Sequence, residues 1–71
     1  MKYLVIFEQG VASWGAYVPD LPGCVAVAET REEVSGLIRE AIAFHLDGLI
    51  EDGSLIPNPY SHAKLVEIGA D

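Results

Sequence analysis

Apolar side chains alternate along residues 2–7, with Tyr3, Val5 and Phe7 on one face and Leu4 and Ile6 on the other. This period of two predicts a β-strand, and apolar groups on both faces are typical of a strand covered on both sides. A turn follows, and residues 13–18 again have strand character. The linker between the two strands is too short for a helix, so the sequence predicts an antiparallel hairpin.

A proline- and glycine-rich segment ends the second strand. Pro19 has no amide hydrogen to donate to a β-ladder, which favours a strand end before it. Pro22 and Gly23 then occupy the two central positions of a four-residue turn. A type II turn needs a positive φ at its third residue, which glycine adopts without strain, so this turn type is predicted. A third strand over residues 25–28 is expected, with small side chains on one face that would let a helix pack closely.

A long helix is predicted from Thr30 onward. The pattern Thr30-Arg31-Glu32-Glu33 is a capping box, in which Thr30 accepts from the amide three residues later and Glu33 reaches back to the cap amide. The helix is expected to reach about Glu51, with Gly53 as a left-handed cap. Its expected apolar stripe consists of Val34, Leu37, Ile38, Ala41, Ile42, His45 and Leu49.

A stiff connector over residues 56–60 leads to an expected last strand over residues 64–68. The predicted fold class is therefore α+β, a single domain over residues 1–71 with the order β-β-β-α-β. A right-handed crossover through the helix would place the fourth strand beside the first, giving the sheet order 3-2-1-4. One helix covers only one face of such a sheet, so the other face requires a partner surface.

The composition changes this picture in two ways. Eleven Asp and Glu stand against four Lys and Arg, a formal charge of −7, which argues against direct nucleic-acid binding and suits a basic protein partner. A chain of 71 residues has a small core, and its single cysteine excludes an internal disulfide, so self-association is expected, as a homodimer first and a homotetramer second. No apolar run approaches the roughly 18 residues of a membrane-spanning helix, and a cytoplasmic location is expected.

The sequence indicates no catalytic, metal or cofactor site. His45 is interpreted as a core or interface residue, His62 as solvated, and Cys24 as a small buried residue, because no base or further ligand accompanies them. Asp20 is predicted to hydrogen-bond its own backbone in an Asx turn. Three acidic residues near the end of the helix, Asp47, Glu51 and Asp52, lie at the negative end of its dipole, which indicates either a solvated face or a docking patch for a cationic partner.

The chain resembles the HicB antitoxin family of type II toxin–antitoxin systems. The segments that carry the resemblance are residues 16–24 (Ala-Tyr-Val-Pro-Asp-Leu-Pro-Gly-Cys), 30–33, 51–53 and 56–59, and the similarity spans about residues 2–68. The resemblance implies a partial, degenerate RNase H-like fold and a role in binding and blocking HicA, a small basic RNA-cleaving toxin. The chain departs from the family in length: many members continue into a DNA-binding domain, whereas this sequence stops at Asp71, so a short form without that domain is expected.

The expected partner-binding residues are chosen by charge and exposure: Tyr17, Pro19, Asp20, Pro22, Gly23, Asp47, Glu51 and Asp52. For the turn, the alternative to a contact role is that it only folds the hairpin. A first alternative function is an orphan homo-oligomeric binding module without a toxin. A second alternative is a metal-dependent nuclease that uses Glu8, Glu40 and Glu67, disfavoured because Val5 and Ile6 occupy the middle of the first strand, where a metal-binding Asp is expected.

Overall fold

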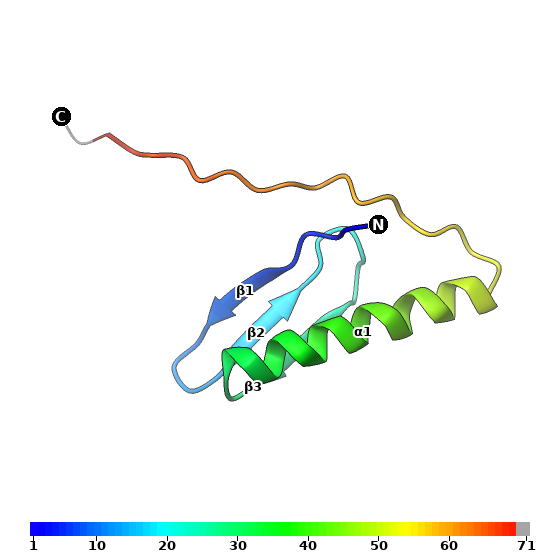
Figure 1. Cartoon of the computed structure of the whole chain (residues 1–71), viewed down its shortest axis with the longest axis horizontal. Coiled ribbons are helices and arrows are strands. Elements are labelled where there is room, and N and C mark those ends of the chain that lie inside the picture. Colours follow the sequence, from blue (N-terminus) through cyan, green and yellow to red (C-terminus); the bar gives the residue numbers. More distant parts are fainter. Residues whose placement is uncertain (70–71) are drawn as a thin grey trace.

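The computed structural model describes residues 1–69 and contains a three-stranded antiparallel sheet with one long helix on one face (Figure 1). The elements are β1 (Ile6–Gln9), β2 (Trp14–Tyr17), β3 (Val25–Ala28) and α1 (Arg31–Glu51). The strand order is β1-β2-β3, so the predicted hairpin and the relative order of the first three strands are confirmed.

The register of the sheet separates its two faces. Phe7, Ala16 and Ala26 form one cross-strand row, and this row faces α1 and joins the core. The neighbouring row of Ile6, Tyr17 and Val25 points to the opposite face. Tyr17 and Val25 are exposed there, so the structure leaves this face uncovered, as the sequence predicts.

β1 begins later than the strand predicted over residues 2–7, at Ile6, and it ends two residues later, at Gln9. Ile6 pairs with Tyr17, the last residue of β2, and β2 ends because the chain turns at Val18 and Pro19. Residues 2–5 therefore run past the end of β2 and have no strand opposite them. The length of β1 is thus limited by the proline that ends its neighbour.

The two ends of α1 follow local sequence signals. The Thr30 hydroxyl accepts from the Glu33 amide at 3.1 Å, which confirms the predicted N-cap. The Glu33 carboxylate accepts from the Thr30 hydroxyl, at 3.0 Å, instead of reaching the cap amide. At the other end Gly53 has φ +70°, and the amides of Gly53 and Ser54 donate to the carbonyls of Ile50 and Leu49. These two bonds form a Schellman motif, so the predicted glycine cap is confirmed.

The helix is much longer than the strands it covers. Twenty-one helical residues span about 31 Å, whereas a four-residue strand spans about 13 Å. Val34 and Ile38, in the first half of α1, are buried against the sheet, but Phe44 is 81% exposed. The second half of α1 therefore extends beyond the sheet (Figure 1).

The predicted apolar stripe of α1 is right in most positions and wrong in one. Leu37 is exposed, and Leu46 packs against the core in addition to Ala41 and Ile42. α1 lies mainly over β3 and β2, where Ala26 and Ala28 present small side chains. This placement turns the side of α1 that carries Leu37 away from the core.

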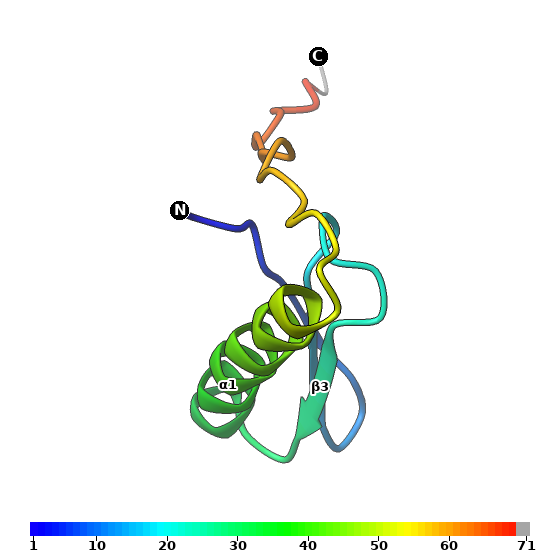
Figure 2. The ribbon, with the colours of Figure 1, turned by 90° about the vertical axis from the view of Figure 1, so that its right-hand side faces the viewer.

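The predicted fourth strand is not formed. Residues 64–68 lie in extended chain without a ladder partner, and they continue away from the sheet (Figures 1 and 2). The expected order 3-2-1-4 is therefore wrong for the described residues, and the sheet ends at β1. The physical reason lies upstream of residue 64, where two hydrogen bonds from Ser61 to Asp20 hold the chain beside residues 18–24 instead of beside β1.

Candidate functional site

The loop of residues 18–24 is a compact unit made of two successive turns. The Leu21 amide donates to the Val18 carbonyl, and the Cys24 amide donates to the Leu21 carbonyl at 3.0 Å. The Val18 amide closes the loop on the Cys24 carbonyl at 3.1 Å. Gly23 has φ +86°, as the third residue of a type II turn requires, so the predicted turn is confirmed.

The side chains of this loop divide into buried and exposed groups. Leu21 is fully buried in the core, while Pro19, Pro22 and Gly23 lie on the surface. Cys24 is buried, as predicted, and burial raises the pKa of its thiol, so the unreactive protonated form is favoured. The loop therefore inserts one apolar anchor and presents a rigid proline–glycine edge to the outside.

Asp20 is not on the surface, although it is one of the expected partner-binding residues. It is 3% exposed, and its two carboxylate oxygens accept from the Ser61 hydroxyl at 2.6 Å and the Ser61 amide at 2.9 Å. These bonds, first of all the one from the Ser61 hydroxyl, lower the pKa of Asp20 against the opposing effect of burial. Asp20 thus attaches the C-terminal segment to the loop, and the predicted Asx turn is replaced by this contact over 41 residues.

The structure brings two of the sequence-predicted surfaces together in one groove. The groove has a volume of about 670 Å³ and runs between the start of β3 and the second half of α1. We call it the acidic groove. Its lining residues are Gly23, Cys24, Val25, Ala41, Phe44, His45, Asp47, Gly48, Leu49, Glu51 and Asp52.

The acidic groove combines apolar walls with carboxylates. Exposed Val25 and Phe44 lie on its two sides, and Asp47, Glu51 and Asp52 follow the end of α1. The last turn of α1 contains no basic residue, so the carboxylates add to the negative end of the helix dipole. A cationic segment with some apolar surface is the ligand chemistry that fits such a groove.

The remaining predicted residues are distributed over other surfaces. Tyr17 and Pro19 are exposed but do not line the acidic groove. His45 lines the groove as a half-buried residue, and His62 is exposed in the C-terminal segment. The predicted partner surface does not include Phe44. The sequence signal for Phe44 is its aromatic side chain, which lies next to the apolar stripe of a helix that is longer than the strands it covers.

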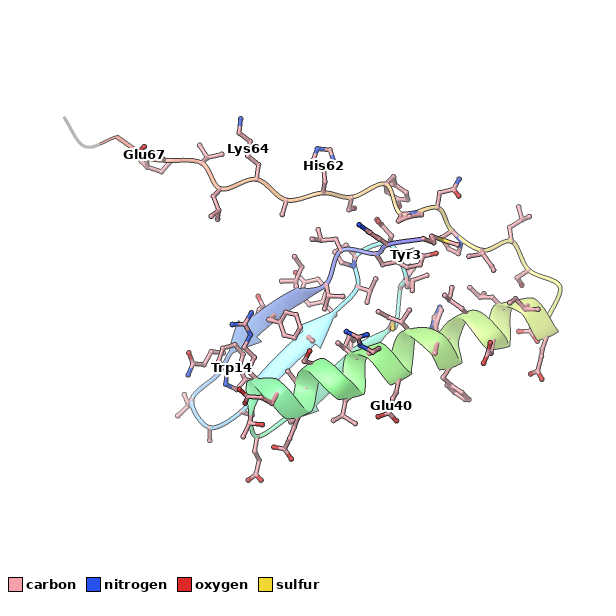
Figure 3. The ribbon with its side chains drawn as sticks, viewed as in Figure 1. Tyr3, Trp14, Glu40, His62, Lys64 and Glu67 are labelled. Carbon is pink, nitrogen blue, oxygen red and sulfur yellow. The ribbon has the colours of Figure 1, made fainter. Side chains whose placement is uncertain are left out.

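The three glutamates of the nuclease hypothesis do not lie together in the structure. Glu8 is in β1, Glu40 is exposed on α1 and Glu67 lies in the C-terminal segment, and Figure 3 shows the last two on separate parts of the molecule. Among residues 1–69 there is no group of three His, Cys, Asp or Glu side chains arranged to hold a metal ion. In the same part of the chain no helix is both long enough and apolar enough to cross a bilayer.

Comparison with known proteins decides the family. The model of the HicB-like antitoxin of bacterial toxin–antitoxin systems matches residues 3–68. The chain belongs to this family. Membership confirms both the resemblance seen in the sequence and the prediction that the chain is not an enzyme, since the family is one of antitoxins and the relative Antitoxin HicB 2 carries the same description.

Individual relatives agree with this assignment. Antitoxin HicB 2 of Photorhabdus laumondii is 32% identical over 99% of this chain and 51% of its own length. An uncharacterized 14.9 kDa protein of Haemophilus phage HP1 is 35% identical over 80% of this chain and 43% of its own length. The chain therefore spans about half the length of the curated relatives it matches.

A solved structure is similar in fold as well as in sequence. A chain of the HicA3 and HicB3 toxin–antitoxin complex superimposes with a TM-score of 0.71 and 28% identity. The match covers 84% of the present chain and 70% of the other. This member of the HicB-like family is thus similar to a chain solved in a toxin–antitoxin complex.

Proposed function

We propose that this chain is an antitoxin that binds and neutralises a small basic HicA-type mRNA-cleaving toxin. The observation that carries the proposal is the similarity to a chain of the HicA3 and HicB3 complex, at a TM-score of 0.71 and 28% identity. The family assignment over residues 3–68 supports the same function.

The acidic groove is the surface that we propose for the toxin. Its three carboxylates, from Asp47, Glu51 and Asp52, favour a basic partner and increase the rate of encounter. Phe44 supplies exposed apolar area in the same groove, and a desolvated aromatic side chain is the type of residue that contributes most to protein interfaces. Pro22 and Gly23 form the rigid border of the proposed surface, with Tyr17 and Pro19 as outer contacts.

We also propose that the chain acts as a homodimer or homotetramer in the cytoplasm, where a toxin that cleaves mRNA finds its substrate. The exposed outer face of the sheet supports self-association, because Tyr17, Val25 and Val27 leave apolar area in contact with water. Two-fold interfaces are the commonest, which makes the dimer the first expectation.

Co-expression with the neighbouring small reading frame tests the proposal that it encodes the toxin. The chain is expected to restore the growth of cells that the toxin arrests, and the two proteins are expected to elute together. A charge-reversed variant, Asp47→Lys, Glu51→Lys and Asp52→Lys, is expected to lose rescue.

The matched control is Glu29→Lys, Glu32→Lys and Glu40→Lys, which changes the net charge equally at exposed positions outside the acidic groove. It is expected to rescue growth as the parent does. Growth that stays arrested with the unaltered chain present would contradict the antitoxin proposal. Rescue by both variants would contradict only the assignment of toxin binding to the acidic groove, and the antitoxin proposal would stand.

A further inference from the structure

A second groove lies on the opposite flank of α1, beside β1. Its volume is about 550 Å³, and Tyr3, Val5 and Phe7 line it on one side with Ile38 and Ile42 on the other. It exists because α1 packs mainly on β3 and β2 and leaves the inner side of β1 less covered. We call it the β1 groove.

The free edge of the sheet borders the β1 groove. β1 pairs with β2 on one side, and it is the outermost strand in the order β1-β2-β3. Its other edge has no strand beside it within the described residues, so a row of backbone donors and acceptors is available there. An edge of this kind is a template for a further strand.

The C-terminal segment has the properties of the strand that this edge lacks. Residues 62–69 are exposed and extended, with Leu65 100%, Val66 66% and Ile68 84% exposed. Val66 and Ile68 share one face in extended chain, as side chains two residues apart do. A monomer that leaves three aliphatic side chains in water along one extended segment has an incomplete packing arrangement.

We propose that residues 64–68 of one copy add as a strand to the free edge of β1 in a second copy, with Val66 and Ile68 in the β1 groove. The two copies exchange these segments reciprocally around a two-fold axis. This interface deepens the self-association proposed above and does not depend on toxin binding.

The points at which the C-terminal segment is attached to its own domain favour pairing with β1 of a second copy over pairing with β1 of the same chain. The Asp20 carboxylate holds Ser61, and the Tyr3 hydroxyl donates to the Pro57 carbonyl. From these two points the segment continues beyond the sheet, as both ribbon views show (Figures 1 and 2). Figure 3 shows His62, Lys64 and Glu67 along this outer part, away from the sheet.

Charge favours a second copy over a basic toxin at this edge. Lys2 and Arg39 line the β1 groove, and they are two of the four Lys and Arg residues in the chain. A basic partner would meet like charges there, which disfavours binding. The segment of residues 62–69 carries Lys64 and Glu67, which cancel, so it meets no net repulsion. The two flanks of α1 thus suit two different partners.

Cross-linking between separately marked chains tests the exchange. Leu4→Cys is made in an affinity-tagged chain and Leu65→Cys in an untagged chain, and the mixture is treated with a short bismaleimide. Leu4 precedes β1, and Cys24 is buried and therefore does not react. A tagged–untagged adduct is expected as the main product, whereas Leu4→Cys with Leu55→Cys, the matched control in the exposed connector, is expected to give little adduct.

Sedimentation equilibrium gives the second measurement. The unaltered chain is expected to be a dimer, and Val66→Lys with Ile68→Lys is expected to weaken dimerisation at least about tenfold, because two lysines would be placed in the β1 groove beside Lys2 and Arg39. The matched control, Ser54→Lys with Leu55→Lys, is expected to dimerise as the parent does. The altered residues are exposed, so the helical circular dichroism signal is expected to be unchanged in both variants.

Three results would overturn the strand exchange, and they have different meanings. A dimer unaffected by Val66→Lys and Ile68→Lys would leave self-association through another surface. Efficient cross-linking at monomer mass in a chain carrying both Leu4→Cys and Leu65→Cys would place the segment on its own β1. A monomeric parent whose lysine variant loses toxin binding would assign the segment to the toxin.

Discussion

The Asp20 carboxylate accepts two hydrogen bonds from Ser61, one from its hydroxyl at 2.6 Å and one from its amide at 2.9 Å. The two residues are 41 positions apart. Through this contact the loop of residues 18–24 fixes where the C-terminal segment leaves the domain. Asp20 is the only buried carboxylate among residues 1–69, and the two hydrogen bonds from Ser61 compensate its burial.

The attachment of the C-terminal segment is expected to depend on pH. The Ser61 hydrogen bonds hold the pKa of Asp20 below its ordinary value of 3.8. The ionised form is favoured in the folded state, so the stabilisation is fully present above that ordinary value and is lost as the pH falls below it through the lowered pKa. The heteronuclear NOE of the Ser61 amide is expected to stay high from pH 7 to 5 and to drop at the acid end.

Two variants separate this contact from general acid unfolding. Asp20→Asn removes the charge and is expected to lower the Ser61 NOE already at pH 7, with α1 still helical. Asp47→Asn, a matched change at an exposed acidic position, is expected to leave it unchanged. An Asp20→Asn chain with a rigid Ser61 at neutral pH would contradict the role given to the carboxylate.

Leu21 is expected to be a major contributor to stability. It is fully buried between the two turns of its loop, so Leu21→Ala leaves a cavity and is expected to lower the free energy of unfolding by about 2–5 kcal/mol. Leu55→Ala, at a position that is almost fully exposed, is expected to change it by less than about 0.5 kcal/mol. Urea denaturation of both variants measures the difference, and equal effects would contradict the packing described here.

Two glycine substitutions are expected to have opposite signs. Gly23 has φ +86°, so Gly23→Ala forces a left-handed conformation on an L-residue and is expected to destabilise by about 1–2 kcal/mol. Gly36 is in the interior of α1, and a Cβ there would meet nothing within 4 Å. Gly36→Ala is therefore expected to stabilise by about 0.5–1 kcal/mol. Thermal unfolding of the two variants measures both changes in stability. A Gly23→Ala variant that is more stable than the parent would contradict the type II turn.

Local signals made much of the fold predictable from the sequence. The Thr30 cap, the Gly53 cap and the turn at Gly23 each depend on residues within a few positions, and each is confirmed. Features that depend on distant partners were not predictable in this way. The alternation over residues 64–68 gives these residues strand character, but pairing requires an edge within reach, and Ser61 holds the segment elsewhere.

The candidate site was predictable in part for the same reason. Asp47, Glu51 and Asp52 were identified by their position at the end of a helix, and the structure adds Phe44 and Val25 to form one groove. Asp20 was misplaced because a carboxylate in a proline–glycine loop is usually exposed, whereas here Ser61 compensates its burial. A partner 41 residues away leaves no local pattern in the sequence.

The relationship between the two grooves gives the proposals a common structural basis. α1 is longer than the sheet and lies toward β3, which opens the acidic groove at its end and the β1 groove on its other flank. A basic toxin is suited to the first and a second copy of the chain to the second. Different residues of α1 line the two grooves, so each groove can be altered by substitution without changing the other.

The most direct test of the central proposal is isothermal titration calorimetry of the purified chain with the product of the neighbouring small reading frame, the proposed HicA-type toxin. Binding is expected, with an affinity that falls as salt rises from 50 to 500 mM and that falls at least about tenfold in Asp47→Lys, Glu51→Lys, Asp52→Lys. The control variant, Glu29→Lys with Glu32→Lys and Glu40→Lys, is expected to retain most of the parent's affinity for the toxin. No heat of binding to the toxin, or an equal affinity for parent and groove variant at every salt concentration, would contradict the account.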